Sequence, residues 1–128
     1  ISRGLVGSEM CIRDRSMIKA LKQNEDLALL IDQRDSSGLE IDFFGKKVLA
    51  TDGFANLAIK YKTMICPVYS IRNQNNKFQI IFEKPLRYEE YKNYDVKGLV
   101  EMIHKKYFEK WITHSPSQWL WVHKRWKL

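Results

Sequence analysis

The feature of this sequence that most limits its fold is the alternation of short apolar runs with helical patterns. Residues 27–31 form an apolar run closed by polar residues, as expected of a strand buried on both faces of a sheet. Residues 64–71 predict a second strand, in which Pro67 indicates a bulge or an edge position. A turn at residues 73–77 would let residues 78–82 pair back as a hairpin.

Helices are predicted around these strands. Residues 17–24 have the pattern of the end of a helix, and Asp52 can cap a second helix over residues 53–62. An apolar stripe at helical spacing predicts a longer helix near the carboxyl end. The stripe consists of Val96, Leu99, Val100, Ile103, Tyr107 and Trp111. The order strand, helix, strand, hairpin, helix indicates an α/β sandwich.

Length and charge set further bounds. The 128 residues have room for one compact domain, and 45% hydrophobic and 29% charged residues are ordinary for a soluble fold. The sequence has no apolar run long enough to span a bilayer. A net charge of +7 favours anionic partners, which include nucleic acid, lipid phosphates and an acidic carrier protein. Cys11 and Cys66 form no disulfide framework, and neither has a second ligand at metal spacing.

Residues 5–15 lack the pattern of a folded element. They have no periodicity, and they match one reading frame of a transposase adapter used in sequencing libraries. We therefore expect residues 1–16 to be an unstructured artefact of sequence assembly, and residues 17–128 to be the carboxyl-terminal part of one domain. On that expectation the chain begins within a gene, so a motif that is missing here does not exclude a function.

The last fifteen residues combine aromatic and basic side chains at a density that few globular surfaces reach. Pro116 fits the first turn of a short helix that Ser115 can cap. On such a helix, indole side chains would pack on the domain while cations remain available to a phosphate-bearing partner. The interleaved residues are Trp119, Trp121, His123, Lys124, Arg125, Trp126 and Lys127.

This ending resembles that of the late acyltransferases of lipid A biosynthesis, which follow the pattern Pro-Glu-Gln-Trp-x-Trp-x-His-x-Arg-Trp/Phe-Lys. The matching residues are Pro116, Gln118, Trp119, Trp121, His123, Arg125, Trp126 and Lys127, with Ser117 in place of the usual Glu. Earlier blocks are similar to the family in the same order. They are Asp32 and Gln33, then Phe43, Phe44 and Gly45, then Gly53, Leu57 and Ala58, then residues 65–68 with Arg72.

The resemblance implies a fold like that of the glycerolipid acyltransferases. It also implies an enzyme that moves a fatty acyl chain from acyl carrier protein to a hydroxyl of a lipid A precursor. Such an enzyme would work at the cytoplasmic face of the inner membrane of a Gram-negative bacterium. The family places its histidine base and carboxylate in a His-x4-Asp/Glu motif upstream of the Asp-Gln block. No histidine precedes Asp32 here, so we expect this fragment to be inactive alone.

Five residues are candidates for the site. Asp32 is assigned a supporting catalytic role, because open α/β sheets place ligands at the carboxyl ends of their strands. Gln33, Arg72, His123 and Arg125 are candidates for substrate binding, and the cations among them would contact phosphate or carrier protein. No cofactor and no metal ion are expected.

Each candidate also has a purely structural interpretation. Asp32 can end a strand or cap the next loop, and the basic candidates can belong to a solvated face. Phe43 and Phe44 fit the core better than the lining of an acyl channel, and Gly45 fits a turn. The tryptophans fit packing or a membrane interface.

His104 and Glu109 have the family's His-x4-Glu spacing at a different place in the chain. They fall in the predicted carboxyl-terminal helix. Five residues of a regular α-helix leave two side chains on different faces, so we expect no catalytic pair there.

Two other functions are compatible with the sequence. One is an acyltransferase for another lipid acceptor, such as a lysophospholipid or a mannolipid. The other is a basic nucleic-acid-binding module, which would use the same cations and aromatic rings. The dispersal of the basic residues and the lack of a recognised binding motif argue against this second function.

Overall fold

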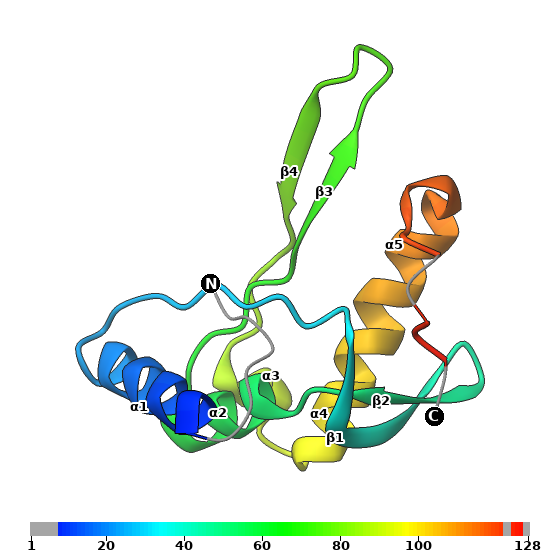
Figure 1. Ribbon diagram of the computed structural model, residues 1–128. Helices are drawn as coiled ribbons and strands as arrows, with labels where there is room; N and C mark the ends of the chain where they lie inside the picture. Colours follow the sequence, from blue (N-terminus) through cyan, green and yellow to red (C-terminus); the bar gives the residue numbers. More distant parts are fainter. Residues whose placement is uncertain (1–7, 122–123, 127–128) are drawn as a thin grey trace. The chain divides into compact units, whose positions relative to one another are not determined.

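The computed structural model of the chain describes residues 8–121 and 124–126. Helices and strands follow one another in mixed order (Figure 1), which confirms the predicted mixture of the two. The strands form two separate antiparallel hairpins. The chain divides into two compact units between Ile31 and Asp32.

The first unit contains the helix α1 (Ser8–Lys22), which is followed by a left-handed Asn24. The predicted helix end near residue 24 is thus confirmed. The prediction that residues 1–16 are unstructured is wrong from Ser8 onward. The physical reason is that Ser8–Lys22 contains no proline or glycine to interrupt a helix. The proposed origin of this segment in an adapter stays a prediction.

Residues 27–31 form no strand, so the first predicted strand is wrong. A strand buried on both faces needs neighbours for its N–H and C=O groups. Among the described residues, no strand pairs with this run, and Leu30 is 66% exposed. Asp32 and Gln33 consequently precede the first strand of the structure rather than follow a buried one.

The second unit begins with the hairpin of β1 (Arg34–Phe43) and β2 (Lys46–Ala50). Its two-residue turn is Phe44-Gly45, and both residues have positive φ, at 50° and 72°. This is the requirement of a type I′ turn, whose twist matches that of the strands. The glycine predicted to permit a turn does so. Alternate residues of the hairpin are buried, namely Ile41, Phe43, Val48 and Ala50.

Gly38 lies at the irregularity in the pairing of β1 with β2. A Cβ atom placed there would be 2.0 Å from the carbonyl oxygen of Ala50. The two strands approach so closely that only glycine fits at this point.

The helix α2 (Gly53–Tyr61) confirms the prediction for residues 53–62. Asp52 occupies the N-cap position, but its side chain makes no cap hydrogen bond. The short helix α3 (Tyr88–Tyr91) brings the Tyr91 hydroxyl to the end of α2, where it donates to the carbonyl oxygens of Ala58 and Thr63. A buried tyrosine therefore closes the carboxyl end of α2.

The second hairpin consists of β3 (Val68–Arg72) and β4 (Phe78–Phe82), as predicted. Figure 1 shows that this hairpin extends away from the helices α2 and α3 of the same unit. Pro67 directly precedes β3, so the strand begins later than the predicted residues 64–71, although the carbonyl oxygen of Pro67 still accepts the amide of Glu83 across the hairpin.

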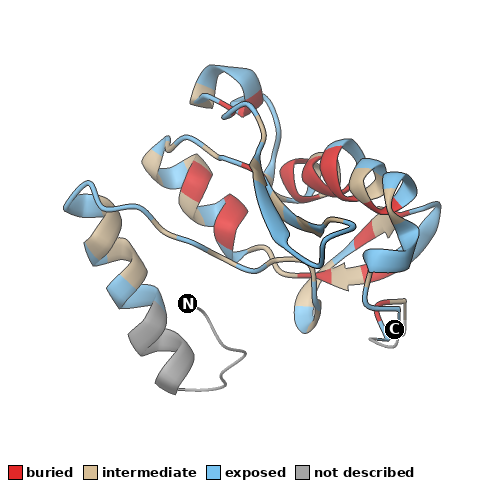
Figure 2. Cartoon of the chain, turned by 90° about the horizontal axis from the view of Figure 1, so that it is seen from above, coloured by how far each residue is buried: buried red, intermediate tan, exposed pale blue. Residues whose placement is uncertain are grey.

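The predicted long helix is present in three parts: α4 (Val96–Ile103), the π-helical turn η1 (His104–Phe108) and α5 (Glu109–His114). Asp95 caps α4 by accepting the amide of Gly98 at 2.7 Å. Most of the predicted apolar stripe is buried, as Leu99, Val100, Ile103 and Tyr107. Figure 2 shows buried residues gathered on α2, on this long helix and on the β1–β2 hairpin, which together form the core of the second unit.

The predicted helix at Pro116 is a short 3-10 helix, η2 (Pro116–Gln118). Trp119 is extended, so the short helix ends before the indole residues that it was expected to carry. Ser115 makes no side-chain cap bond. His123, with Val122 and Lys127, lies outside the described residues.

Candidate functional site

The guanidinium of Arg125 lies inside the protein and is 1% exposed. One of its terminal nitrogens donates to the carbonyl oxygen of Leu49 at 2.6 Å, and the other lies 2.8 Å from Nε2 of His104. The predicted alternative of a solvated basic face is therefore wrong for Arg125. Burial lowers the pKa of Arg125 to about 10, and the charge of Asp32 acts in the opposite direction.

His104 is the hydrogen-bonding partner that makes this burial possible. Its Nδ1 lies 2.9 Å from the carbonyl oxygen of Val100, so Nδ1 carries the proton and Nε2 accepts from Arg125. The ring has no solvent exposure. Burial lowers the pKa of His104 to about 4, with a smaller contribution from the neighbouring guanidinium. His104 is therefore neutral near pH 7.

The ring of Phe43 contacts several residues of the carboxyl-terminal segment. Its ring stacks on Trp126 at 5.3 Å between centroids and 6° between planes, and the guanidinium of Arg125 lies 5.6 Å from its centroid. Trp126 also donates its indole N–H to the carbonyl oxygen of Phe43 at 3.2 Å. Trp119 meets the same ring edge-on at 6.5 Å. Phe43 is thus a core residue, as expected.

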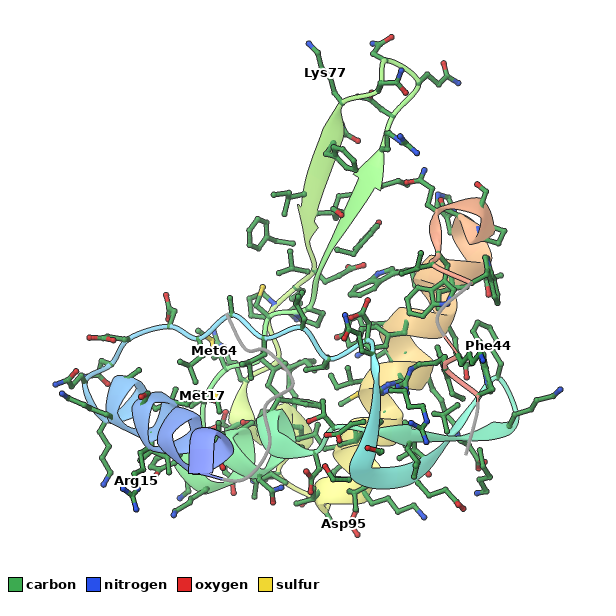
Figure 3. The ribbon with its side chains drawn as sticks, in the orientation of Figure 1. Arg15, Met17, Phe44, Met64, Lys77 and Asp95 are labelled. Carbon is green, nitrogen blue, oxygen red and sulfur yellow. The ribbon has the colours of Figure 1, made fainter. Side chains whose placement is uncertain are left out.

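Phe44 and Glu109 connect the turn of the first hairpin to the long helix. The amide of Phe44 donates to a carboxylate oxygen of Glu109 at 2.7 Å. Figure 3 shows Phe44 at this turn, where 40% of the residue is exposed. Glu109 is thereby engaged by the backbone and His104 by Arg125, so these two residues do not form a catalytic pair.

The reason why His104 and Glu109 form no catalytic pair differs from the one predicted. The helix is not regular between His104 and Glu109, because the amide of Glu109 bonds the carbonyl oxygen of His104 in the i→i+5 pattern of a π-helix. The pair is separated by its hydrogen-bonding partners rather than by regular helical spacing.

Gln118 holds the free edge of β3. Its carboxamide accepts the amide of Arg72 at 2.8 Å and donates to the carbonyl oxygen of Arg72 at 3.0 Å. The side chain of Gln118 thus pairs with Arg72 as a neighbouring strand would. The guanidinium of Arg72 is exposed and lies 5.9 Å from the centroid of Phe78.

Two buried N–H groups have no hydrogen-bonding partner among the described residues, and these are Nε of Arg125 and Nε1 of Trp119. Both side chains contact Phe43. Asp32 is half-buried and attracts the Arg125 guanidinium, whereas Gln33 is exposed. The structure therefore brings Asp32 and Arg125 into one electrostatic environment, while Arg72 lies on the other hairpin.

The sequence profile described as bacterial lipid A biosynthesis acyltransferase matches residues 2–128. The chain belongs to this family. No individual curated protein shows significant sequence similarity to the chain. Three of the blocks that carry the resemblance are far apart in sequence, namely residues 43–45, residues 65–68 with Arg72, and the carboxyl-terminal ending. The ending contacts the other two blocks, through Trp126 on Phe43 and through Gln118 on Arg72.

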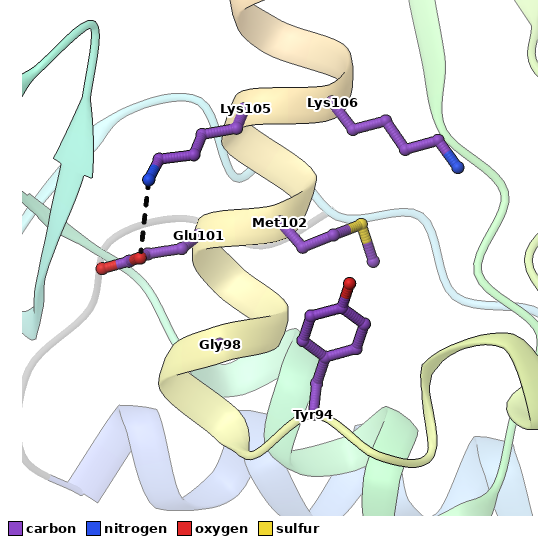
Figure 4. A pocket seen from close by; sticks show the side chains of 6 residues that line it. All are labelled: Tyr94, Gly98, Glu101, Met102, Lys105 and Lys106. Carbon is purple, nitrogen blue, oxygen red and sulfur yellow. Dashed lines mark ion pairs between the residues drawn. The ribbon is translucent and has the colours of Figure 1, made fainter.

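The described part of this acyltransferase holds no group of three or more His, Cys, Asp and Glu side chains placed to bind a metal ion. Within the same residues, no helix is both long and apolar enough to cross a membrane. An open depression of about 490 Å³ lies beside α4 (Figure 4). Its lining residues are Tyr94, Gly98, Glu101, Met102, Lys105 and Lys106. The depression shares no residue with the cluster of Phe43, His104, Trp119, Arg125 and Trp126, although His104 lies between its lining residues Met102 and Lys105 along the helix.

Sequence reasoning missed His104 as the partner of Arg125. A signal was present, because His104 follows Val100 by four residues and so shares the buried face of the helix. It also missed the role of Gln118, since nothing in the local pattern shows that a glutamine will pair with a distant strand edge. The predicted lipid contacts of Gln33, Arg72, His123 and Arg125 stay predictions.

Proposed function

We propose that the protein carrying these residues transfers a fatty acyl chain from acyl carrier protein to a hydroxyl of a lipid A precursor. The proposed place is the cytoplasmic face of the inner membrane, and the proposed fold is a glycerolipid-acyltransferase-like α/β sandwich. The single observation that supports this best is the family match over residues 2–128. The contacts of the carboxyl-terminal ending with Phe43 and with Arg72 support it further, because they bring three of the blocks that resemble the family together in the folded chain.

Ester formation by attack on a thioester requires a base that removes the hydroxyl proton. Among the described residues, His104 cannot be that base, because it is buried and both ring nitrogens are hydrogen-bonded. His114 is exposed at the end of α5, and no side chain in the described part of the chain orients its ring by a hydrogen bond. We therefore assign to this chain the scaffold and part of the substrate site, and we expect no transfer by the chain alone.

Asp32 has the proposed supporting role, since its carboxylate is half-buried beside the positive charge of Arg125. Gln33 and Arg72 are exposed and available to a polar head group. Arg125 would need the carboxyl-terminal turn to open before it could reach a phosphate, because its terminal nitrogens already bind Leu49 and His104.

The experiment is expression of the gene that carries this chain in a host lacking its own late acyltransferases, with mass spectrometry of lipid A. We expect lipid A heavier by one acyl chain, and Asp32→Asn should reduce that product at least roughly tenfold because it removes a charge at the site. Asp52→Asn is the matched control, since the Asp52 side chain makes no cap hydrogen bond.

Unchanged lipid A would contradict the proposal, and an acylated lysophospholipid or mannolipid would redirect it to another acceptor. Equal product from both variants would remove Asp32 from the site. Transfer by the purified 128-residue chain, supplied with acyl carrier protein thioester and precursor, would contradict the expected inactivity.

A further inference from the structure

One face of the β3–β4 hairpin is apolar and uncovered. The register pairs Val68 with Phe82, Ser70 with Ile80 and Arg72 with Phe78, so the six side chains share one face. Phe78, Ile80 and Phe82 are 65–70% exposed, and Val68 is 41% exposed. An exposed row of large apolar residues on one strand is unusual for a soluble domain and marks a surface that meets another apolar phase.

The opposite face and the outer edge of the hairpin contact the carboxyl-terminal helices of the chain. Tyr69 stacks on Trp111 at 4.5 Å between ring centroids. The indole N–H of Trp111 donates to Glu83, just beyond β4, at 3.0 Å. Gln118 closes the outer edge of β3 at Arg72. The hairpin is therefore anchored on one side, and its apolar face points away from that anchor.

The charged residues of the hairpin have one sign. From Val68 to Phe82 the sequence contains no carboxylate, whereas it contains Arg72 and Lys77. Figure 3 shows Lys77 at the tip of the hairpin, and the guanidinium of Arg72 lies over the ring of Phe78. The hairpin therefore presents an apolar row bordered by cations and by no anion. This pattern is complementary to a surface that is apolar inside and negatively charged at its boundary.

We infer that this face of the hairpin docks on the surface of an anionic lipid bilayer. The phenylalanine and aliphatic side chains would enter the boundary between head groups and acyl chains, while Arg72 and Lys77 would bind lipid phosphates. A polypeptide partner would need no such exclusion of carboxylates, so charge favours the bilayer. The inference rests on the proposed function, since an enzyme with a membrane lipid as its acceptor must reach it within the plane of the bilayer.

Insertion would be shallow for a physical reason. A two-stranded hairpin leaves backbone N–H and C=O groups unpaired along its edges, and these groups cannot enter hydrocarbon without a large free-energy cost. Only the side chains of the apolar face can pass the head groups. The bilayer surface, and not its interior, is therefore the phase that this face fits.

The test is co-sedimentation of the full chain with vesicles of phosphatidylethanolamine and phosphatidylglycerol, compared with vesicles of phosphatidylcholine. We expect preferential binding to the anionic vesicles. Phe78→Ser combined with Phe82→Ser should weaken it roughly tenfold or more, because two aromatic side chains lose their burial. Leu30→Ser with Tyr94→Ser is the matched control, since these apolar residues are also exposed but lie outside the hairpin.

The charge is tested separately. Arg72→Gln with Lys77→Gln should remove most of the preference for anionic over neutral vesicles, whereas Lys105→Gln with Lys106→Gln should not. Equal binding by the hairpin variant and the control, or no binding by the unaltered chain, would overturn the inference. So would self-association without vesicles that the two serine substitutions abolish, because a second copy would then cover the face. Vesicle binding and lipid A mass are independent measurements, so failure of this inference is distinguishable from failure of the proposed acyl transfer.

Discussion

The buried guanidinium of Arg125, which binds a neutral imidazole, is held by contacts with three different residues. Arg125 has three nitrogens, of which two meet acceptors on different elements, Leu49 on β2 and His104 on the π-helical turn. Its flat group also lies over the Phe43 ring. A side chain that makes all three contacts must end in a planar group with N–H donors pointing in fixed, different directions. Among the amino acids only arginine has such a group.

We therefore predict that Arg125→Lys destabilises the protein by about 2 kcal/mol, because one ammonium cannot satisfy both acceptors and leaves a buried acceptor unpaired. Urea denaturation followed by tryptophan fluorescence measures the change in the free energy of unfolding. Lys124→Gln is the control, since its exposed neighbouring side chain should change stability by less than about 0.5 kcal/mol. Equal stability of the two variants would contradict the structural role of Arg125.

At the scale of elements, one carboxamide, that of Gln118, connects the 3-10 helix η2 to the hairpin β3–β4. Gln118 supplies both a donor and an acceptor to the backbone of Arg72, which would otherwise have a free edge. Tyr69 of β3 also stacks on Trp111 of α5, the helix that precedes η2. The hairpin is thus oriented by side chains rather than by a larger sheet.

Gln118→Ala should leave the Arg72 amide without its acceptor. Hydrogen exchange of that amide should accelerate by roughly fivefold, since one hydrogen bond contributes about 1 kcal/mol to the protection of this edge. Exchange measured residue by residue by NMR is the appropriate readout. The amide of Ile71, inside the same strand, gives an internal comparison, and Ser117→Ala is the matched substitution. An unchanged exchange rate at Arg72 would show that the carboxamide does not protect this edge.

The sequence predicted those elements whose signal is local. Helix α2, the β3–β4 hairpin and the buried stripe of the long helix follow from periodicity and turn residues. Residues 27–31 were mispredicted because their apolar pattern is compatible with a strand only if neighbouring strands exist. The site around Arg125 was not predictable, since its partners lie on distant elements and no local pattern distinguishes a buried arginine from a solvated one.

For the whole molecule, His104 connects stability to pH. Its pKa is about 4 in the folded protein, while an unfolded histidine titrates near its ordinary value of 6.5. Between these values the unfolded chain binds the extra proton, so stability rises with pH. The contribution is fully present above pH 6.5 and is lost as the pH falls towards about 4.

The expected loss between these limits is about 3 kcal/mol, from 1.36 kcal/mol for each pH unit. Free energies of unfolding measured by urea titration across this pH range test the prediction. His104→Gln should flatten the slope, because glutamine does not titrate there, whereas His114→Gln, at an exposed position, should preserve it. A slope unchanged by His104→Gln would assign the pH dependence to other groups.

The bonds of Arg125 to Leu49 and of Trp126 to Phe43 join residues 76 and 83 positions apart. Closing such long loops is slow and has a high entropic cost, so local hairpins and helices form earlier. We expect the cluster to assemble late along the folding pathway. Substitutions in the cluster would then accelerate unfolding while hardly changing the refolding rate. The lifetime of the folded protein in the cell would therefore depend on its carboxyl-terminal residues more than on its strands.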